Sequence, residues 1–415
     1  MHATLLSSEP AAKSSLTTSP TRIRLVFSEE IEPSLGRIRL VGPGGRVIAL
    51  KSSGDPRNVS ALVAPITSPL APGVYRVEWR IVSEDGHPID GDYSFSLAGP
   101  ADSAHPPATA TPSAPIPAAE AEPTPSAPDT AVVGRSALAD VPIGAAALRG
   151  IAVGALTAFA GLLGFLTTRR SPAPQPRAAR LVGRLAMATA VAVPLHFLAW
   201  ALAVSPEHSL GGDTFAALLA SGPGKVEAIR AALALLAVWA LLLVRRERLA
   251  LLIAFLAILV SSATGHSAAI HPEWGIPGRA LHLLAAGAWL GGLLWLVSLD
   301  RSDAPAAIVE AERVSSLALT AVIVVTLSGV VQTRLFLPVW ADLIQSPYGF
   351  IVLAKLAGVG VLVLFGAYHR FRVLPRLADE AVAQGFTVSL RREIVVMSLL
   401  VLLGGLLAYL SPPTH

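Results

Sequence analysis

The feature that most constrains this chain is a series of long apolar segments beyond residue 141. They cover approximately 142–168, 181–204, 226–244, 249–267, 279–298, 314–336, 350–369 and 393–410. Each is close to or above the roughly 20 residues that span a bilayer as a helix. Only 14% of the chain is charged, against about 25% in soluble domains. We therefore predict an α-helical transmembrane bundle of eight helices over residues 141–411. The run Phe215–Ala220 is too short to span, and we expect a surface or re-entrant turn there.

The basic residues predict how this bundle lies in the membrane. Fifteen of them fall in the loops on one side of the predicted helices, whereas the other side has Lys225, Arg230, Arg279 and Arg334 near its helix ends. Because cytoplasmic loops carry the excess of Lys and Arg, the N-terminal region and the C-terminus are expected to be extracytoplasmic. The fifteen are Arg169, Arg170, Arg177, Arg180, Arg184, Arg245, Arg246, Arg248, Arg301, Arg313, Arg370, Arg372, Arg376, Arg391 and Arg392.

The first 98 residues have the pattern of a separate β domain. Apolar and polar side chains alternate over 21–27, 36–40 and 74–81, and a further strand-like run covers 93–97. Glycine- and proline-rich turns separate these runs, which is typical of an all-β sandwich of about 100 residues. Residues 99–140 follow as a linker, with nine prolines between Pro100 and Pro128. Such a composition favours extended chain and cannot bury a core.

The potential metal ligands are unusually restricted. The chain has no Cys, three Met and ten His, so thiolate sites and disulfides are excluded. On the predicted topology five histidines fall in the outer half of the bilayer or just beyond it. Polar side chains at that depth are costly and usually functional, and neutral imidazole is the commonest metal ligand. We predict His196, His266, His271 and His282 as metal ligands, with His208 a weaker candidate; a hydrogen-bonding His196 and an interfacial His271 are the alternatives.

A second candidate site lies in the β domain. Asp85 and His87 flank Gly86 in a loop between two predicted strands, so their side chains can converge across the glycine turn. A carboxylate and an imidazole, with a further nitrogen, suit tetragonal Cu(II). An ordinary polar loop would show the same three residues, so the motif alone leaves both interpretations open.

Longer stretches of the chain resemble two known families. His2-Ala3, Leu25–Ile31, Gly73–Trp79 and Ser83–Pro88 are similar to the copper-resistance CopC family of periplasmic, cupredoxin-like sandwiches. Gly265–Ala268, His282–Gly292, Phe336–Lys355 and Arg372–Pro375 resemble CopD, an inner-membrane family implicated in copper import. The whole resembles a fusion of the two: a cupredoxin-like sandwich (1–98), a linker (99–140) and a membrane domain (141–411).

The resemblance implies Cu(II) ligands for the sandwich. In the CopC family they are the N-terminal His, through its amine and ring, with the Asp and His of the Asp-Gly-His motif; these correspond to His2, Asp85 and His87. Met1 precedes His2 and would convert that amine to an amide. Since export of the sandwich requires a signal peptide, we expect Met1 to stand where a cleaved leader ended.

Together these patterns predict a copper protein of the bacterial inner membrane. The sandwich is expected to capture Cu(II) and pass it to an outward-facing site of His196, His266, His271 and His282 for import, with copper in the membrane domain as a second bound ion. Expected partners are copper, the bilayer and periplasmic copper proteins, and neither enzymatic activity nor nucleic-acid binding is predicted. Two alternatives stay open: a haem b cytochrome that reduces copper, with axial pairs His196–His282 or His266–His196, and a copper sensor or scaffold without transport.

Overall fold

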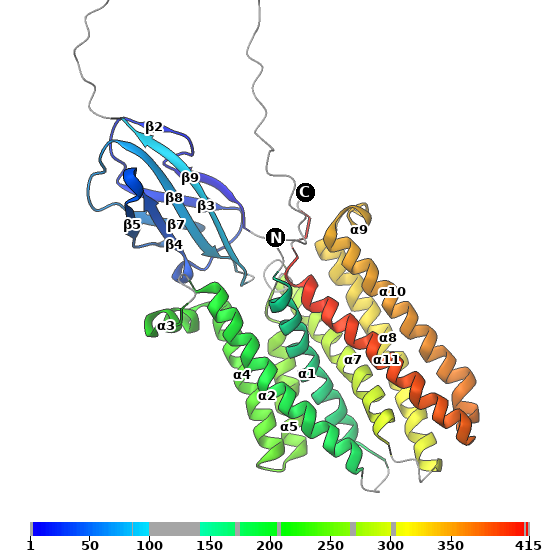
Figure 1. Ribbon diagram of the computed structural model, residues 1–415. Coiled ribbons are helices and arrows are strands. Elements are labelled where there is room, and N and C mark those ends of the chain that lie inside the picture. The colour runs from blue at the N-terminus through cyan, green and yellow to red at the C-terminus, as the bar shows by residue number, and fades with distance from the viewer. Residues whose placement is uncertain are drawn as a thin grey trace, which may run out of the picture.

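The computed structural model describes residues 3–84, 86–98, 142–170, 175–205, 209–265, 271–299, 304–410 and 412–413 of the 415-residue chain. A β domain sits on one end of a set of long helices (Figure 1). The predicted linker over 99–140 lies outside the described residues.

The β domain contains two sheets. One sheet has the order β1-β3-β7-β6 and the other the order β2-β9-β8-β4-β5. All four predicted runs are strands, within a few residues of their expected ends. The strands are β1 (Leu5–Glu9), β2 (Ser15–Leu16), β3 (Arg22–Phe27), β4 (Arg37–Val41), β5 (Val47–Leu50), β6 (Ser53–Asp55), β7 (Asn58–Pro65), β8 (Gly73–Val82) and β9 (Pro88–Leu97).

Alternation along β8 builds the core between these sheets. Val77, Trp79 and Ile81 are buried, as their period-2 spacing predicts. Trp79 packs edge-on against Phe27 of the other sheet, with ring centroids 5.1 Å apart. β8 and β9 pair along their whole length, down to Val82 opposite Pro88. The hairpin therefore holds the loop Ser83–His87 at one end of the domain.

Each of the eight predicted apolar segments overlaps one long helix, although α8 and α11 begin ten and thirteen residues before their segments. In the described part of the chain five helices are long and apolar enough to cross a membrane: α1, α2, α7, α8 and α10. Segment 249–267 was predicted too long, because its helix ends at Ser261. The helices are α1 (Ile143–Thr167), α2 (Pro176–Val204), α3 (Gly212–Ala220), α4 (Gly222–Leu242), α5 (Glu247–Ser261), α7 (Pro272–Ser298), α8 (Ala304–Phe336), α9 (Asp342–Gln345), α10 (Pro347–Tyr368) and α11 (Glu380–Leu407).

Glycines allow the central helices to approach closely. A Cβ on Gly291 of α7 would lie 2.2 Å from the backbone of Gly161 on α1, so no larger residue fits there without separating the helices. Gly358 of α10 is similarly close to Leu400 of α11, whereas the space beside Gly360 is open. Gly291 and Gly358 thus allow close helix packing, as small residues commonly do in membrane bundles.

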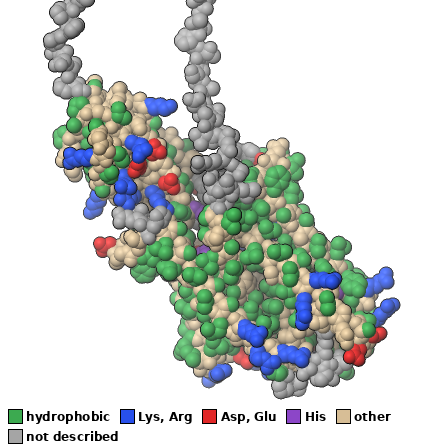
Figure 2. Space-filling model, in the orientation of Figure 1, with side chains coloured by type: hydrophobic (Ala, Val, Ile, Leu, Met, Phe, Trp, Pro, Cys, Tyr) green, Lys and Arg blue, Asp and Glu red, His purple; other side chains and the backbone are tan. Residues whose placement is uncertain are grey.

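The β domain packs where α2 ends and α4 begins. Leu35 and Val82 of the β domain share a buried apolar cluster with Trp200, Val204 and Leu218 of the helices. Leu218 belongs to α3, the short helix that replaces the turn predicted at Phe215–Ala220 and lies beside the β domain (Figure 1). At the other end of the helices, beyond a mainly hydrophobic band, basic side chains gather (Figure 2).

Candidate functional site

The predicted copper loop touches the helices directly. Gly86 has φ +85°, a left-handed conformation that favours glycine. Its carbonyl accepts a 2.9 Å hydrogen bond from Nε1 of Trp200 on α2. The His87 ring meets the Tyr409 ring edge-on, with centroids 5.4 Å apart. His87 is consequently only 6% exposed, enclosed between its own domain and the end of the bundle.

A short series of contacts continues from His87 into the bundle. The guanidinium of Arg149 on α1 lies over the Tyr409 ring, 5.9 Å from its centroid. A Cβ on Gly265 would be 3.3 Å from Nη2 of Arg149 and 3.1 Å from Nη1 of Arg279, so both guanidinium groups flank that backbone position. Gly265 immediately precedes His266 in the chain. The two stretches predicted to bind copper therefore meet at the same end of the helices.

One helical turn before Trp200, His196 belongs to a buried charged network. Nη2 of Arg230 lies 2.7 Å from Nδ1 of His196, and Arg230 also forms an ion pair with Glu227. All three side chains are almost fully buried between α2 and α4. With Arg230 donating to Nδ1, neutral His196 carries its proton on Nε2; a copper ion at Nε2 requires the other tautomer, which Glu227, 3.6 Å from Nδ1, is placed to support.

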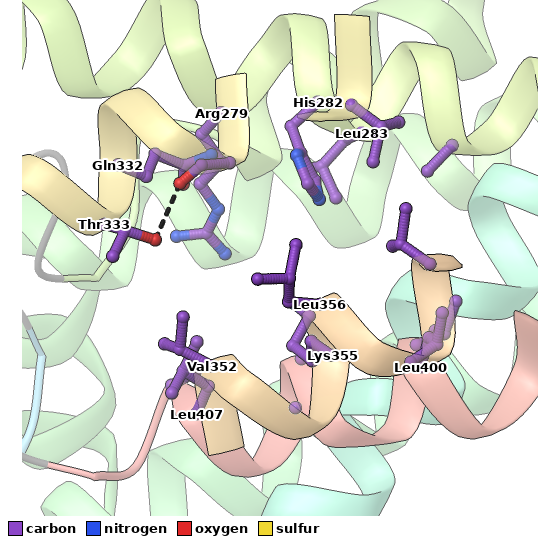
Figure 3. Close-up of a pocket in the computed structure, with 18 of the residues that line it drawn as sticks. Arg279, His282, Leu283, Gln332, Thr333, Val352, Lys355, Leu356, Leu400 and Leu407 are labelled. Atoms are coloured by element: carbon purple, nitrogen blue, oxygen red, sulfur yellow. Dashed lines mark hydrogen bonds between the residues drawn. The ribbon is translucent and has the colours of Figure 1, made fainter. Parts of the chain in front are cut away.

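His282 occupies a different environment, on the wall of a cavity of about 370 Å³. Its Nδ1 lies 3.0 Å from Oγ of Ser328 on α8. Since that hydroxyl donates to the carbonyl of Val324, Nδ1 is the donor and Nε2 keeps its lone pair. A histidine oriented in this way by a neighbouring group is the usual form of a metal ligand. His282 and Arg279 project from α7 into the cavity (Figure 3).

The remaining predicted ligands divide into two groups. His271 directly precedes α7 and is half-exposed. Its Nδ1 lies 3.5 Å from Oε1 of Glu273. His2, Asp85, His208 and His266 lie outside the described residues. Within the residues that are described, no group of three or more potential metal ligands comes together. His282 lines the cavity and His196 does not, so the cavity does not bring together the His196–His282 pair of the haem alternative; His266 of the other pair lies outside the described residues.

The structure also shows buried charges that the sequence analysis missed or misplaced. Arg230 and Arg279 were counted as loop residues near helix ends, but Arg230 is buried and Arg279 faces the cavity. Arg149 and Glu227 were not singled out. The sequence could have pointed to both, because a charged residue within a predicted apolar helix marks an internal partner or a functional site.

His369, which directly follows α10, is buried as well. Its Nε2 lies 2.8 Å from Oγ of Ser389 and its Nδ1 lies 3.3 Å from Glu393 of α11. The side chain therefore turns inward at the end of α10, toward a hydroxyl and a carboxylate of α11.

Two regions of the chain, one near each end, match models of known families. Residues 5–98 match the family model of the CopC domain, and residues 309–407 match that of copper resistance protein D. "Copper transport protein CutJ" of Bacillus subtilis is 28% identical over 396 residues, which is 89% of this chain and 67% of that protein. "Copper resistance protein C" of Escherichia coli is 38% identical over 106 residues, covering 23% of this chain and 81% of that protein.

Solved structures of CopC proteins match about a quarter of the chain. PcoC of Escherichia coli is 31% identical, with a TM-score of 0.21, over 24% of this chain and 100% of its own. CopC of Methylosinus trichosporium OB3b is 29% identical, with a TM-score of 0.22, over 23% of this chain and 93% of its own. On these matches the chain belongs to the copper-resistance CopC family, and it carries in the same polypeptide a region, residues 309–407, that matches the model of copper resistance protein D.

Proposed function

We propose that the CopC domain captures Cu(II) through His2, Asp85 and His87 and passes it to histidines of the membrane domain for import. The observation that carries this proposal is the contact of the copper loop with the bundle, where the Gly86 carbonyl is bonded to Trp200. At this contact the copper loop lies one helical turn from His196. Contacts through Tyr409 and Arg149 also connect the loop to Gly265, the residue that precedes His266.

The burial of His87 separates copper capture from copper delivery. With the domains docked, His87 has almost no contact with solvent, so we infer that capture takes place with the CopC domain apart and delivery with it docked. The segment 99–140, proposed as the linker, keeps the domain near the bundle in both steps. Tethering raises its effective concentration at the bundle, so weak docking is sufficient.

The ligand types on both sides suit such a transfer. Nitrogen and oxygen donors of the loop and imidazoles of the bundle are ligands of the same class for Cu(II). His282 presents an unprotonated Nε2 to the cavity and is the best prepared acceptor among the described histidines. We place the bundle in the inner membrane as eight spanning helices, with the CopC domain and C-terminus extracytoplasmic, and assign it transport rather than catalysis.

Copper accumulation tests the membrane site. We expect proteoliposomes containing the double variant His266→Ala, His282→Ala to take up copper at least about tenfold more slowly than wild type, since a lost metal-site contact costs one to two orders of magnitude. The control is His271→Ala, whose side chain is half-exposed at the start of α7 and whose loss should have the smaller effect. Equal uptake by wild type and the double variant would contradict the proposal.

A further inference from the structure

The cavity beside His282 has an unusual distribution of charge. It lies between α1, α7, α8, α10 and α11, and its volume of about 370 Å³ is within the usual range for small-molecule sites, roughly 300–1,000 Å³. Three basic side chains line it, Arg149, Arg279 and Lys355, and among its described lining residues there is no Asp or Glu. This lining favours an anion, and its positive charge opposes a metal cation at His282 until an anion is bound.

The three basic groups have no carboxylate partner among the described residues. Arg279 donates to the carbonyl of Thr264, Arg149 lies over Tyr409, and Nζ of Lys355 passes close to Gly404 of α11. The nearby carboxylate of Glu227 is already paired with Arg230. Cations removed from water in this way cost free energy until an anion pairs with them.

The polar and apolar parts of the cavity wall are separated along the bundle. Arg149, Arg279 and Tyr348 lie near the first turns of α1, α7 and α10, at the end that carries the CopC domain. The deeper wall is apolar, with Leu362 and Leu400 among its residues. In Figure 3, Arg279 faces Val352 and Leu356 across the cavity, and Leu400 continues the apolar side. A ligand that fits has an anionic head at the membrane surface and an alkyl chain directed inward.

We propose that this cavity binds an acyl-chain anion, a lipid or fatty acid whose phosphate or carboxylate headgroup pairs with Arg149 and Arg279. Its chain lies along the apolar wall formed by α8, α10 and α11. Bound there, the anion offsets the positive charge beside His282. The headgroup pairs with residues other than the proposed copper ligands, so lipid retention and copper uptake are separate measurements, and failure of one proposal is distinguishable from failure of the other.

Native mass spectrometry of the full chain in detergent tests the site. The probes are phosphatidylglycerol, oleate, phosphatidylcholine and inorganic phosphate, each added separately. Wild type is expected to retain one phosphatidylglycerol or oleate at least about tenfold better than phosphatidylcholine, and their ratio identifies the natural source of the headgroup. The double variant Arg149→Gln, Arg279→Gln should lose this preference. Lys225→Gln, which removes an exposed charge at the same end of the bundle, should keep it.

Several results would overturn the proposal. These are equal retention of phosphatidylcholine, displacement of the lipid by inorganic phosphate alone, or an unchanged preference in the double variant. A Soret band in the purified chain would show that haem fills the cavity instead. If the double variant fails to fold, the single variant Arg279→Lys is measured instead. It keeps the positive charge, so it should keep the preference for anionic lipid, and loss of that preference would contradict the proposal.

Discussion

Replacing His87 with alanine is expected to lower the affinity of the full chain for Cu(II) at least about 100-fold. The proposed site has few ligands, and even the loss of a group that only orients a ligand costs about 10–100-fold in metal affinity. A direct ligand should cost no less. The measurement is a competition titration of the chain in detergent against a chelator, with the Cu(II) spectrum recorded by electron paramagnetic resonance.

A matched control separates loss of a ligand from damage to the hairpin. Asp90→Asn changes an exposed carboxylate on β9, three residues after His87, and should leave the affinity and spectrum unchanged. If His87→Ala bound Cu(II) as tightly as wild type, the Asp-Gly-His loop would not be the capture site, whatever the family resemblance implies.

The second large effect concerns stability. Glu227→Ala should destabilise the folded membrane domain by about 3–5 kcal/mol, because removing one partner of a buried ion pair leaves the other charge uncompensated. Arg230 would then remain almost fully buried next to His196, with Arg149 adding further positive charge in the same region. Thermal unfolding of the detergent-solubilised chain, followed by size-exclusion chromatography, measures the loss.

Two further variants identify the cause. Replacing both members of the pair, Glu227→Leu with Arg230→Leu, should recover most of the lost stability, since apolar replacement of a whole buried pair is often neutral. Glu312→Ala, at an exposed position of α8, should have almost no effect. A Glu227→Ala variant as stable as wild type would show that the network contributes nothing to the fold.

Periodicity and length predicted the architecture because they report burial directly. Alternation in 74–81 identified the buried face of β8, and each predicted apolar run overlaps a long helix, although α8 and α11 begin ten and thirteen residues before their runs. The wrong end of segment 249–267 shows the limit: small and apolar residues continue past Ser261, although the helix stops there. Hydropathy does not record where a helix loses its backbone hydrogen bonds.

The site was only partly predictable from the sequence. Asp85, His87 and the membrane histidines could be proposed from their chemistry, but the partners of each depend on which helices become neighbours. Arg230 stands close to a predicted helix end, and only the packing of α4 against α2 makes it a buried partner of His196. Likewise the role of Trp200 became visible only when the CopC domain was seen to dock on α2.

The most direct test of the handover is copper accumulation by proteoliposomes carrying Trp200→Phe. This variant keeps an aromatic ring but removes the N–H that binds the Gly86 carbonyl, an interaction worth about 0.5–1.5 kcal/mol. We predict that Cu(II) binding by the CopC domain is unchanged while copper accumulation falls about threefold or more. Accumulation at the wild-type rate would contradict transfer through this contact.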